Sequence, residues 1–130
     1  MRKIINLTQH AATKDQQKAG VVDIADSDLL AGLHDALTFQ DPPSKEELDN
    51  RARYIAELAC LAFSEDGNTH PTEAMIGGAP FFMSHLERAL KAIHIRPLYA
   101  FSRREVVETK AEDGGVQKTA IFKHIDFIES

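Results

Sequence analysis

The chain has 130 residues, of which 43% are hydrophobic and 27% are charged, and its formal net charge is −5. These proportions are ordinary for a soluble globular domain and argue against a disordered, collagenous or disulfide-scaffold protein. The length predicts one domain over residues 1–130. The negative net charge argues against a protein that coats duplex nucleic acid, which needs a basic surface.

The sequence shows neither a secretory signal nor a membrane span. The apolar pair Ile4 and Ile5 is followed at once by Asn6, whereas a signal peptide needs roughly 7–15 apolar residues. No run approaches the roughly 20 apolar residues of a membrane helix. We therefore expect a cytoplasmic protein with no membrane partner. The single cysteine, Cys60, leaves no disulfide within the chain.

The first third of the chain predicts a strand, a long loop and a helix. Residues 3–7 are short and apolar, as a strand is, while the polar stretch 8–20 has no apolar periodicity and predicts a loop. Residues 21–24 predict a short strand or an extended connector. A helix follows over residues 26–37, where leucines recur at helical spacing behind two good N-cap residues.

The middle of the chain predicts two further helices around one strand. After the Pro-Pro break, Ser44 and Glu47 form a capping box for a helix to about Phe63. Residues 64–72 predict a loop, and residues 74–76 a short buried strand. The next helix is predicted over residues 79–94, with a proline in its first turn.

The last part of the chain predicts a strand and a hairpin. Residues 95–101 are apolar, residues 106–110 continue extended, and residues 116–122 return after a turn at 113–115. Strands that alternate with helices imply a mostly parallel sheet. We therefore expect an α/β fold, a small three-layer Rossmann-like domain with a mostly parallel sheet and a C-terminal antiparallel hairpin.

The charge is unevenly distributed along the chain. Residues 23–73 hold twelve acidic and three basic residues, a net charge of −9. The remaining segments hold eight acidic and twelve basic residues, a net charge of +4. The acidity therefore belongs to the two middle helices, and the strand-bearing segments are compatible with a small anionic ligand.

Three polar motifs follow the predicted strands directly. Because parallel strands end at one edge of the sheet, we expect these motifs to meet in the crevice where open α/β sheets bind ligands. The predicted ligand-binding residues are Asn6, Thr8 and Gln9 after the first strand, Gly77 and Gly78 after the second, and Ser102, Arg103 and Arg104 after the third.

The glycine and arginine motifs indicate an anionic ligand. Gly77 and Gly78 lead into a helix, so a ligand can approach the backbone closely and meet the helix's first amides; their alternative role is a simple turn. Arg103 and Arg104 present planar forks suited to phosphate, and in a strand only one of them faces the crevice. The alternative is a solvated arginine, or one paired with a nearby glutamate. Ser102 would donate to the same anion.

His10 is the candidate catalytic residue, as an acid or base at a strand end. The alternative is a surface histidine, with Asn6 and Thr8 fixing the loop. The sequence contains no metal-ligand spacing, GxSxG elbow or Walker loop. It therefore predicts no metal site and no cofactor.

The motifs NLTQH, IGGAPFF and PLYAFSRR, followed by the hairpin GGVQKTAIFKHIDFIE, resemble a small bacterial family of uncharacterised proteins. The resemblance covers nearly the whole chain and implies no activity, cofactor or catalytic residue. More loosely, the layout is similar to Rossmann-like domains that sense or cleave nucleotides, including CRISPR-associated ones, a likeness of fold alone.

Three functions follow, in order of preference. The first is binding of a small phosphate-bearing ligand, a nucleotide before others, as a sensor or a slow enzyme. The second is a protein–protein interaction module without a ligand, acting through the acidic helical layer or the hairpin edge, which would also serve a homodimer. The third is a hydrolase using His10 and Glu73, although the predicted strand places these two residues at opposite ends of the sheet.

Overall fold

The computed structural model describes residues 2–65, 70–110, 112 and 114–130. Within these residues no helix is long and apolar enough to cross a membrane. The elements, in chain order, are β1 (Ile4–Leu7), α1 (Lys14–Lys18), β2 (Val21–Val22), α2 (Ser27–Ala36), α3 (Lys45–Glu65), β3 (Glu73–Ile76), α4 (Pro80–Ala92), β4 (Arg96–Lys110) and β5 (Val116–Glu129).

The five strands form one sheet in the order β2-β1-β3-β4-β5. The first three contacts, β2 with β1, β1 with β3 and β3 with β4, are parallel. The last, β4 with β5, is antiparallel, and β5 lies at the edge of the sheet. The predicted class, an α/β fold with a mostly parallel sheet and a C-terminal antiparallel hairpin, is confirmed.

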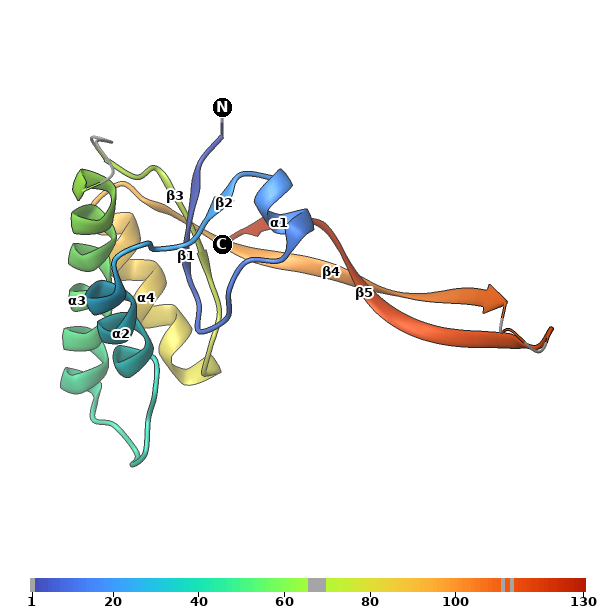
Figure 1. The fold of residues 1–130 in the computed structure, drawn as a ribbon. Helices are drawn as coiled ribbons and strands as arrows, with labels where there is room; N and C mark the ends of the chain where they lie inside the picture. The colour runs from blue at the N-terminus through green and yellow to red at the C-terminus, as the bar shows by residue number, and fades with distance from the viewer. Residues whose placement is uncertain (1, 66–69, 111, 113) are drawn as a thin grey trace.

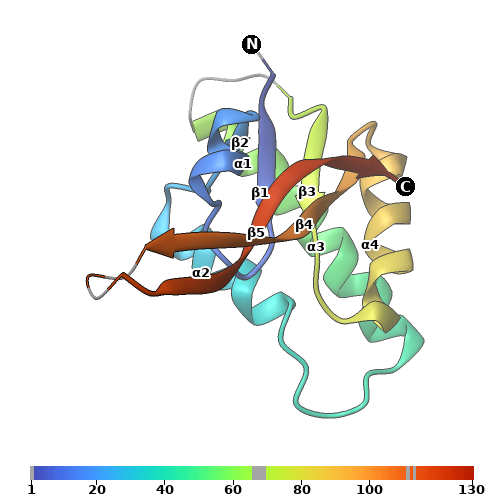
Figure 2. The same ribbon diagram turned by 90° about the vertical axis from the view of Figure 1, so that its right-hand side faces the viewer.

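Helices lie on both faces of the sheet. Helices α2, α3 and α4 cover one face, and the short α1 lies on the other (Figures 1 and 2). The main core forms between the three long helices and the sheet. A smaller cluster on the α1 side joins Ile4, Val21, Met75 and Leu98. Because β1 and β3 are covered on both faces, every residue of the two strands is buried, and buried residues do not alternate with exposed ones.

Helix α1 lies in the stretch for which the sequence predicted only a loop, so that prediction was wrong in part. A capping box starts the helix: the Gln16 amide donates to Oγ1 of Thr13 at 3.2 Å, and the Thr13 amide donates to Oε1 of Gln16 at 3.0 Å. No residue of α1 is buried. The helix therefore leaves no apolar periodicity in the sequence, and only its cap marks it.

The predicted end of the third strand was also wrong, because β4 continues to Lys110. It pairs with β5 from Leu98–Glu129 to Lys110–Val116, with a register shift between Phe101 and Ser102. Beyond that shift the two strands extend away from the rest of the domain (Figures 1 and 2). The centre of the predicted loop at 64–72 and residue 113 of the predicted turn lie outside the described residues.

Helix α4 ends in a Schellman motif with a strained residue. The His94 amide donates to the Lys91 carbonyl at 3.1 Å, and the Ile95 amide donates to the Leu90 carbonyl at 3.0 Å. This arrangement puts His94 at a φ of 63°, a left-handed conformation that glycine adopts without the steric cost of a Cβ.

Replacing His94 by glycine is expected to stabilise the protein by about 1 kcal/mol, because the Cβ clash of the left-handed conformation is removed and the imidazole that is lost is exposed. Thermal unfolding should show a melting temperature about 4 °C higher. The control is Ser84→Gly in the interior of the same helix, which should lower stability by about 0.5 kcal/mol. A His94→Gly protein that melts at or below the parent temperature would contradict this reading of the helix end.

Candidate functional site

The carboxyl ends of β1 and β3 form a crevice at the point where the strand order reverses. From β1 the chain goes to β2 on one side, while β3 lies on the other side of β1. Helix α1 then leaves on one face of the sheet and α4 on the opposite face (Figures 1 and 2). Such a switch point separates the two loops and is where open α/β sheets bind ligands.

A cavity of about 430 Å³ occupies this position. Its volume lies within the range of small-molecule sites. It is lined by the β1–α1 loop and the start of α1, by the end of β3 and the two glycines that follow it, and by the first part of β4: Thr8, Gln9, His10, Ala11, Thr13, Gln16, Met75, Ile76, Gly77, Gly78, Tyr99 and Ala100. Five of the predicted site residues, Thr8, Gln9, His10, Gly77 and Gly78, are therefore brought together.

Asn6, at the end of β1, fixes the conformation of the β1–α1 loop through its side-chain hydrogen bonds. Its Nδ2 donates to the His10 carbonyl at 2.8 Å and to Oδ1 of Asp23 at 2.7 Å. Its Oδ1 accepts from the Thr8 amide at 3.0 Å and from the Thr8 hydroxyl at 2.7 Å. These four bonds use the full hydrogen-bonding capacity of a side chain that is only 4% exposed. Asn6 does not line the 430 Å³ cavity, and it acts on the site by ordering the loop that does.

Asp23 is a second loop-fixing residue, and the sequence reasoning did not single it out. Its carboxylate accepts from the Asn6 side chain and, at 3.1 Å, from the Ala12 amide. It thereby ties the end of β2 to the β1–α1 loop. The signal in the sequence is its position directly after the short strand Val21–Val22. Because β1 and β2 are parallel neighbours, the residue that follows β2 lies beside the loop that follows β1.

His10 is exposed and lines the cavity. Its backbone carbonyl is fixed by Asn6, but in the described part of the chain no side chain hydrogen-bonds to its imidazole. A general base in an enzyme is normally oriented by a further polar group. The geometry supports a ligand contact by His10 more directly than catalysis.

The two glycines lead into a helix whose first turn has no side-chain cap. Ala79 occupies the N-cap position and Pro80 follows it, so the first amides of α4 donate to no capping side chain. Gly78 has a φ of +153°, a region essentially restricted to glycine. A Cβ on Gly77 would lie 3.6 Å from Cγ2 of Thr8. A Cβ there would make only an ordinary contact with Thr8, whereas a larger side chain would extend into the space between the two loops.

Tyr99 closes the cavity from β4, and the sequence reasoning missed it. Its hydroxyl donates to Oε2 of Glu87 at 2.5 Å. Burial, together with this hydrogen bond and the negative charge of Glu87, raises the pKa of the tyrosine. The hydroxyl stays protonated and is committed to Glu87, so Tyr99 offers its ring to the cavity. The signal in the sequence is the position of Tyr99, an aromatic residue within the apolar stretch 95–101 that leads to the predicted strand end.

Ser102, Arg103 and Arg104 do not line the cavity, so their predicted position was wrong. They lie within β4, paired with His124, Lys123 and Phe122, and all three are exposed. The physical reason is that β5 continues to pair with β4 beyond the body of the sheet, so the third motif is not at a strand end. The lining residues given above consequently include no lysine, arginine, aspartate or glutamate.

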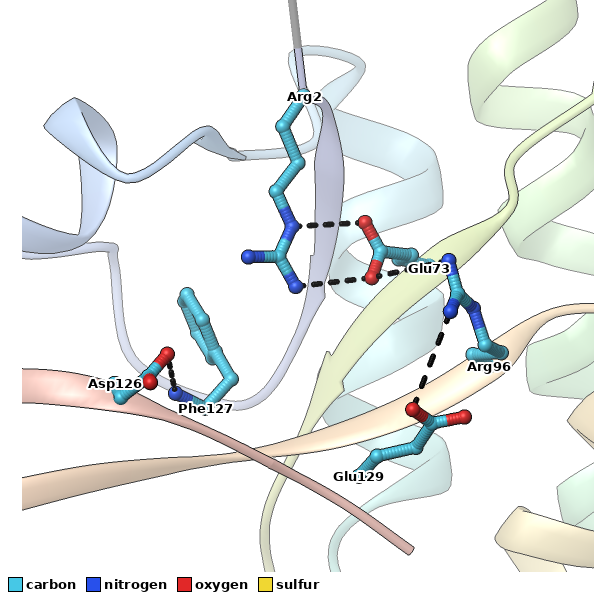
Figure 3. A network of polar contacts seen from close by, with 6 residues as sticks. All are labelled: Arg2, Glu73, Arg96, Asp126, Phe127 and Glu129. Atoms are coloured by element: carbon cyan, nitrogen blue, oxygen red, sulfur yellow. Dashed lines mark hydrogen bonds and ion pairs between the residues drawn. The ribbon is translucent and has the colours of Figure 1, made fainter.

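Glu73 lies at the opposite, amino end of β3 and forms a clamp there. Its two carboxylate oxygens accept from Nε and Nη2 of Arg2 at 2.9 and 3.0 Å, and Arg96 lies 3.6 Å away (Figure 3). The hydrogen bonds and charge of Arg2, with the charge of Arg96, lower the pKa of Glu73 against the opposing effect of its burial. Arg96 also reaches Glu129 at 4.0 Å. The clamp joins the N-terminus, β3, β4 and β5.

This placement separates Glu73 from His10 by the length of β3. The expectation that the two residues lie at opposite ends of the sheet is confirmed, and a hydrolase that uses both is not supported. In the described residues, no three His, Cys, Asp or Glu side chains converge as a metal site would require.

A family model matches residues 2–128, and its description is the uncharacterized protein MJ1673 family. The chain belongs to this family. The match includes both the crevice and the long β4–β5 ribbon. No curated protein and no solved structure matches the chain. Membership of the MJ1673 family assigns no function to the chain, because the family itself is uncharacterized.

Replacing Glu73 by glutamine should lower the unfolding free energy at pH 7 by about 1–3 kcal/mol, because the buried charge that Arg2 binds is lost. The sign of the pH dependence follows from the lowered pKa. The contribution is present above the unfolded-state pKa of about 4.3 and is lost as the pH falls through the lower folded-state pKa.

Urea unfolding at pH 7 and pH 3 measures this effect. The parent should lose more stability on acidification than Glu73→Gln does. Glu46→Gln, at an exposed position of α3, should retain the parent's full loss. Equal losses in the parent and in Glu73→Gln would show that the clamp does not contribute to acid sensitivity.

Proposed function

We propose that this member of the MJ1673 family binds a small phosphate-bearing ligand, a nucleotide before others, in the β1–β3 crevice. The observation that carries the proposal is the pair Gly77–Gly78 at the switch point, leading into the uncapped first turn of α4. Pro80 has no amide and the Phe82 amide donates to the Ala79 carbonyl at 3.0 Å, so the support from α4 is the positive end of its helix dipole, which favours a phosphate. The absence of a Cβ at Gly77 leaves room for close approach.

The neutral lining narrows the class of ligand. Without an arginine or lysine among the lining residues, the crevice has only polar side chains, loop backbone and His10 to balance negative charge, with the start of α4 directly after Gly77–Gly78. A ligand with a single phosphate suits this surface better than a di- or triphosphate. Thr8 and Gln9 offer hydrogen bonds on one side, and Met75 and Tyr99 offer apolar contact on the other, as a nucleoside requires. We therefore favour a nucleoside monophosphate.

The site supports binding and sensing ahead of catalysis. His10 is the one lining residue suited to acid–base chemistry near neutral pH. Its imidazole has no orienting partner in the described residues, so a slow reaction that uses His10 as acid or base remains the second form of this proposal.

Binding should appear as a rise in melting temperature and as heat in titration calorimetry when a nucleoside monophosphate is added. Gly77→Val should weaken binding at least about tenfold, because its side chain fills the space beside Thr8. His10→Ala should weaken binding by less. The matched control is the double variant Arg103→Ala/Arg104→Ala, which removes two positive charges outside the crevice and should bind as the parent does.

The panel must contain nucleosides, nucleoside mono-, di- and triphosphates, and sugar phosphates. No response to any of them, or binding that Gly77→Val leaves intact, would overturn the proposal. Binding that disappears in the double arginine variant would restore the original expectation that those residues meet the ligand.

Partner-protein binding is the second candidate function. It is favoured by the exposed apolar side chains of the β4–β5 ribbon, among them Phe122 at 77% exposure. The acidic layer of α2 and α3 offers a second surface, on the opposite side of the molecule from the ribbon (Figure 1). The charge reversal Glu46→Lys tests the acidic surface. Loss of partner binding in this variant, with its response to nucleotides retained, would favour partner-protein binding.

A further inference from the structure

The outer part of the β4–β5 ribbon has no cover from the rest of the molecule. We call residues 102–110 of β4 and 116–124 of β5 the arm. All of its side chains are exposed except those of Glu105 and His124, which are half-buried. The arm extends from the body on the side away from α2, α3 and α4 (Figures 1 and 2).

Large apolar side chains lie on both faces of the arm. Cross-strand pairing places Phe122, Val106 and Val116 on one face, where they are 77%, 63% and 61% exposed. Val107 and Ile121 lie on the other face. A two-stranded hairpin that packs on nothing is at best marginally stable in water. The arm therefore needs a cover that the chain's own described residues do not supply.

The arm also presents free strand edges. Strand β3 pairs with β4 only over Arg96–Leu98. Beyond that point, the edge of β4 that faces away from β5 pairs with no strand in the described chain. Unpaired backbone amides and carbonyls on such an edge are a template for another strand.

The charges of the two edges differ. Within the arm, β5 carries only the positive Lys118 and Lys123, so two copies of that edge offer no opposite charges to pair. The arm segment of β4 carries both signs, with arginines near its base and glutamates further out. The β4 edge is therefore the one suited to a second copy of itself.

We propose that the arm pairs antiparallel with the arm of a second copy through β4, and that Val106 of one copy lies opposite Val106 of the other. The product is a two-fold dimer with a four-stranded sheet in the order β5-β4-β4-β5. Such a contact is isologous and closes on itself, so it gives a dimer and not a fibre. The proposal goes beyond the crevice and does not rest on ligand binding.

The charge pattern selects this register. In a two-fold antiparallel pair, one residue must face its own copy, and a charged residue at that point would face an identical charge, which is destabilising. With Val107 at the axis, Arg104 would face Lys110. With Val106 at the axis, Arg104 faces Glu108, and the symmetry repeats this pair on the other side. The remaining uncharged positions, Ser102 and Thr109, lie near the ends of the β4 segment. A two-fold axis at either of them would pair only a few residues of the two arms.

The mass of the protein in solution tests the dimer, measured by sedimentation equilibrium over a range of concentrations. We expect twice the chain mass for the parent. Arg104→Glu and Glu108→Arg should each raise the dimer's Kd at least about tenfold, and combining the two should restore it to within about threefold of the parent. Arg103→Glu is the matched control, since that arginine faces the neutral Thr109 and its reversal should have little effect.

A cysteine at position 106 tests the register directly. In a Cys60→Ala background, Val106→Cys should form a disulfide-linked dimer on mild oxidation, because directly opposite Cβ atoms lie about 5 Å apart. Ala120→Cys, across the arm from Val106 on β5, should not. A protein that is monomeric at every concentration overturns the proposal. A dimer indifferent to Arg104→Glu, or one that links at position 120 instead, also overturns it.

Discussion

The parallel pairing of β1 with β3 is the contact on which both the core and the crevice depend. Ile5 lies opposite Ala74 and Leu7 opposite Ile76, and every residue of both strands is buried. Because the strands run in the same direction, the loop of His10 and the pair Gly77–Gly78 leave the sheet side by side. Helices α1 and α4 then depart on opposite faces (Figure 1), and the cavity is lined by the β1–α1 loop, by Gly77–Gly78 and by the neighbouring part of β4.

Charged groups are kept out of this crevice and used elsewhere. Glu73 fastens the N-terminus to the far end of the sheet through Arg2 and Arg96. Most of the acidity lies on and around α2 and α3, and the arm carries both signs. The crevice is left with backbone dipoles, amides and hydroxyls. The net charge of +4 on the strand-bearing segments therefore comes from residues outside the crevice, and the described residues that line the candidate site include no lysine, arginine, aspartate or glutamate.

Strand β4 belongs to two environments. Leu98 is buried in the smaller cluster, and Tyr99 packs against the main core while lining the crevice. After the register shift between Phe101 and Ser102 the same strand continues into the arm, where it pairs with β5. A bulge of this kind bends and twists the strands, and it lies three residues beyond Leu98, where pairing of β4 with β3 ends. The proposed ligand site and the proposed dimer contact are thus neighbours along one strand, with separate chemistry.

The sequence by itself determined the class of fold, the three long helices and the polar residues at the ends of β1 and β3, because apolar periodicity, caps and glycines are local signals. It marked α1 only by its cap, because that helix buries nothing, and it did not show the roles of Tyr99 and Asp23, which depend on neighbours elsewhere in the chain. The tertiary structure alone decided the strand order, and with it which two motifs meet. It also moved Ser102, Arg103 and Arg104 from the crevice to the arm, since a strand ends where its hydrogen-bonding partner ends, and that partner is β5.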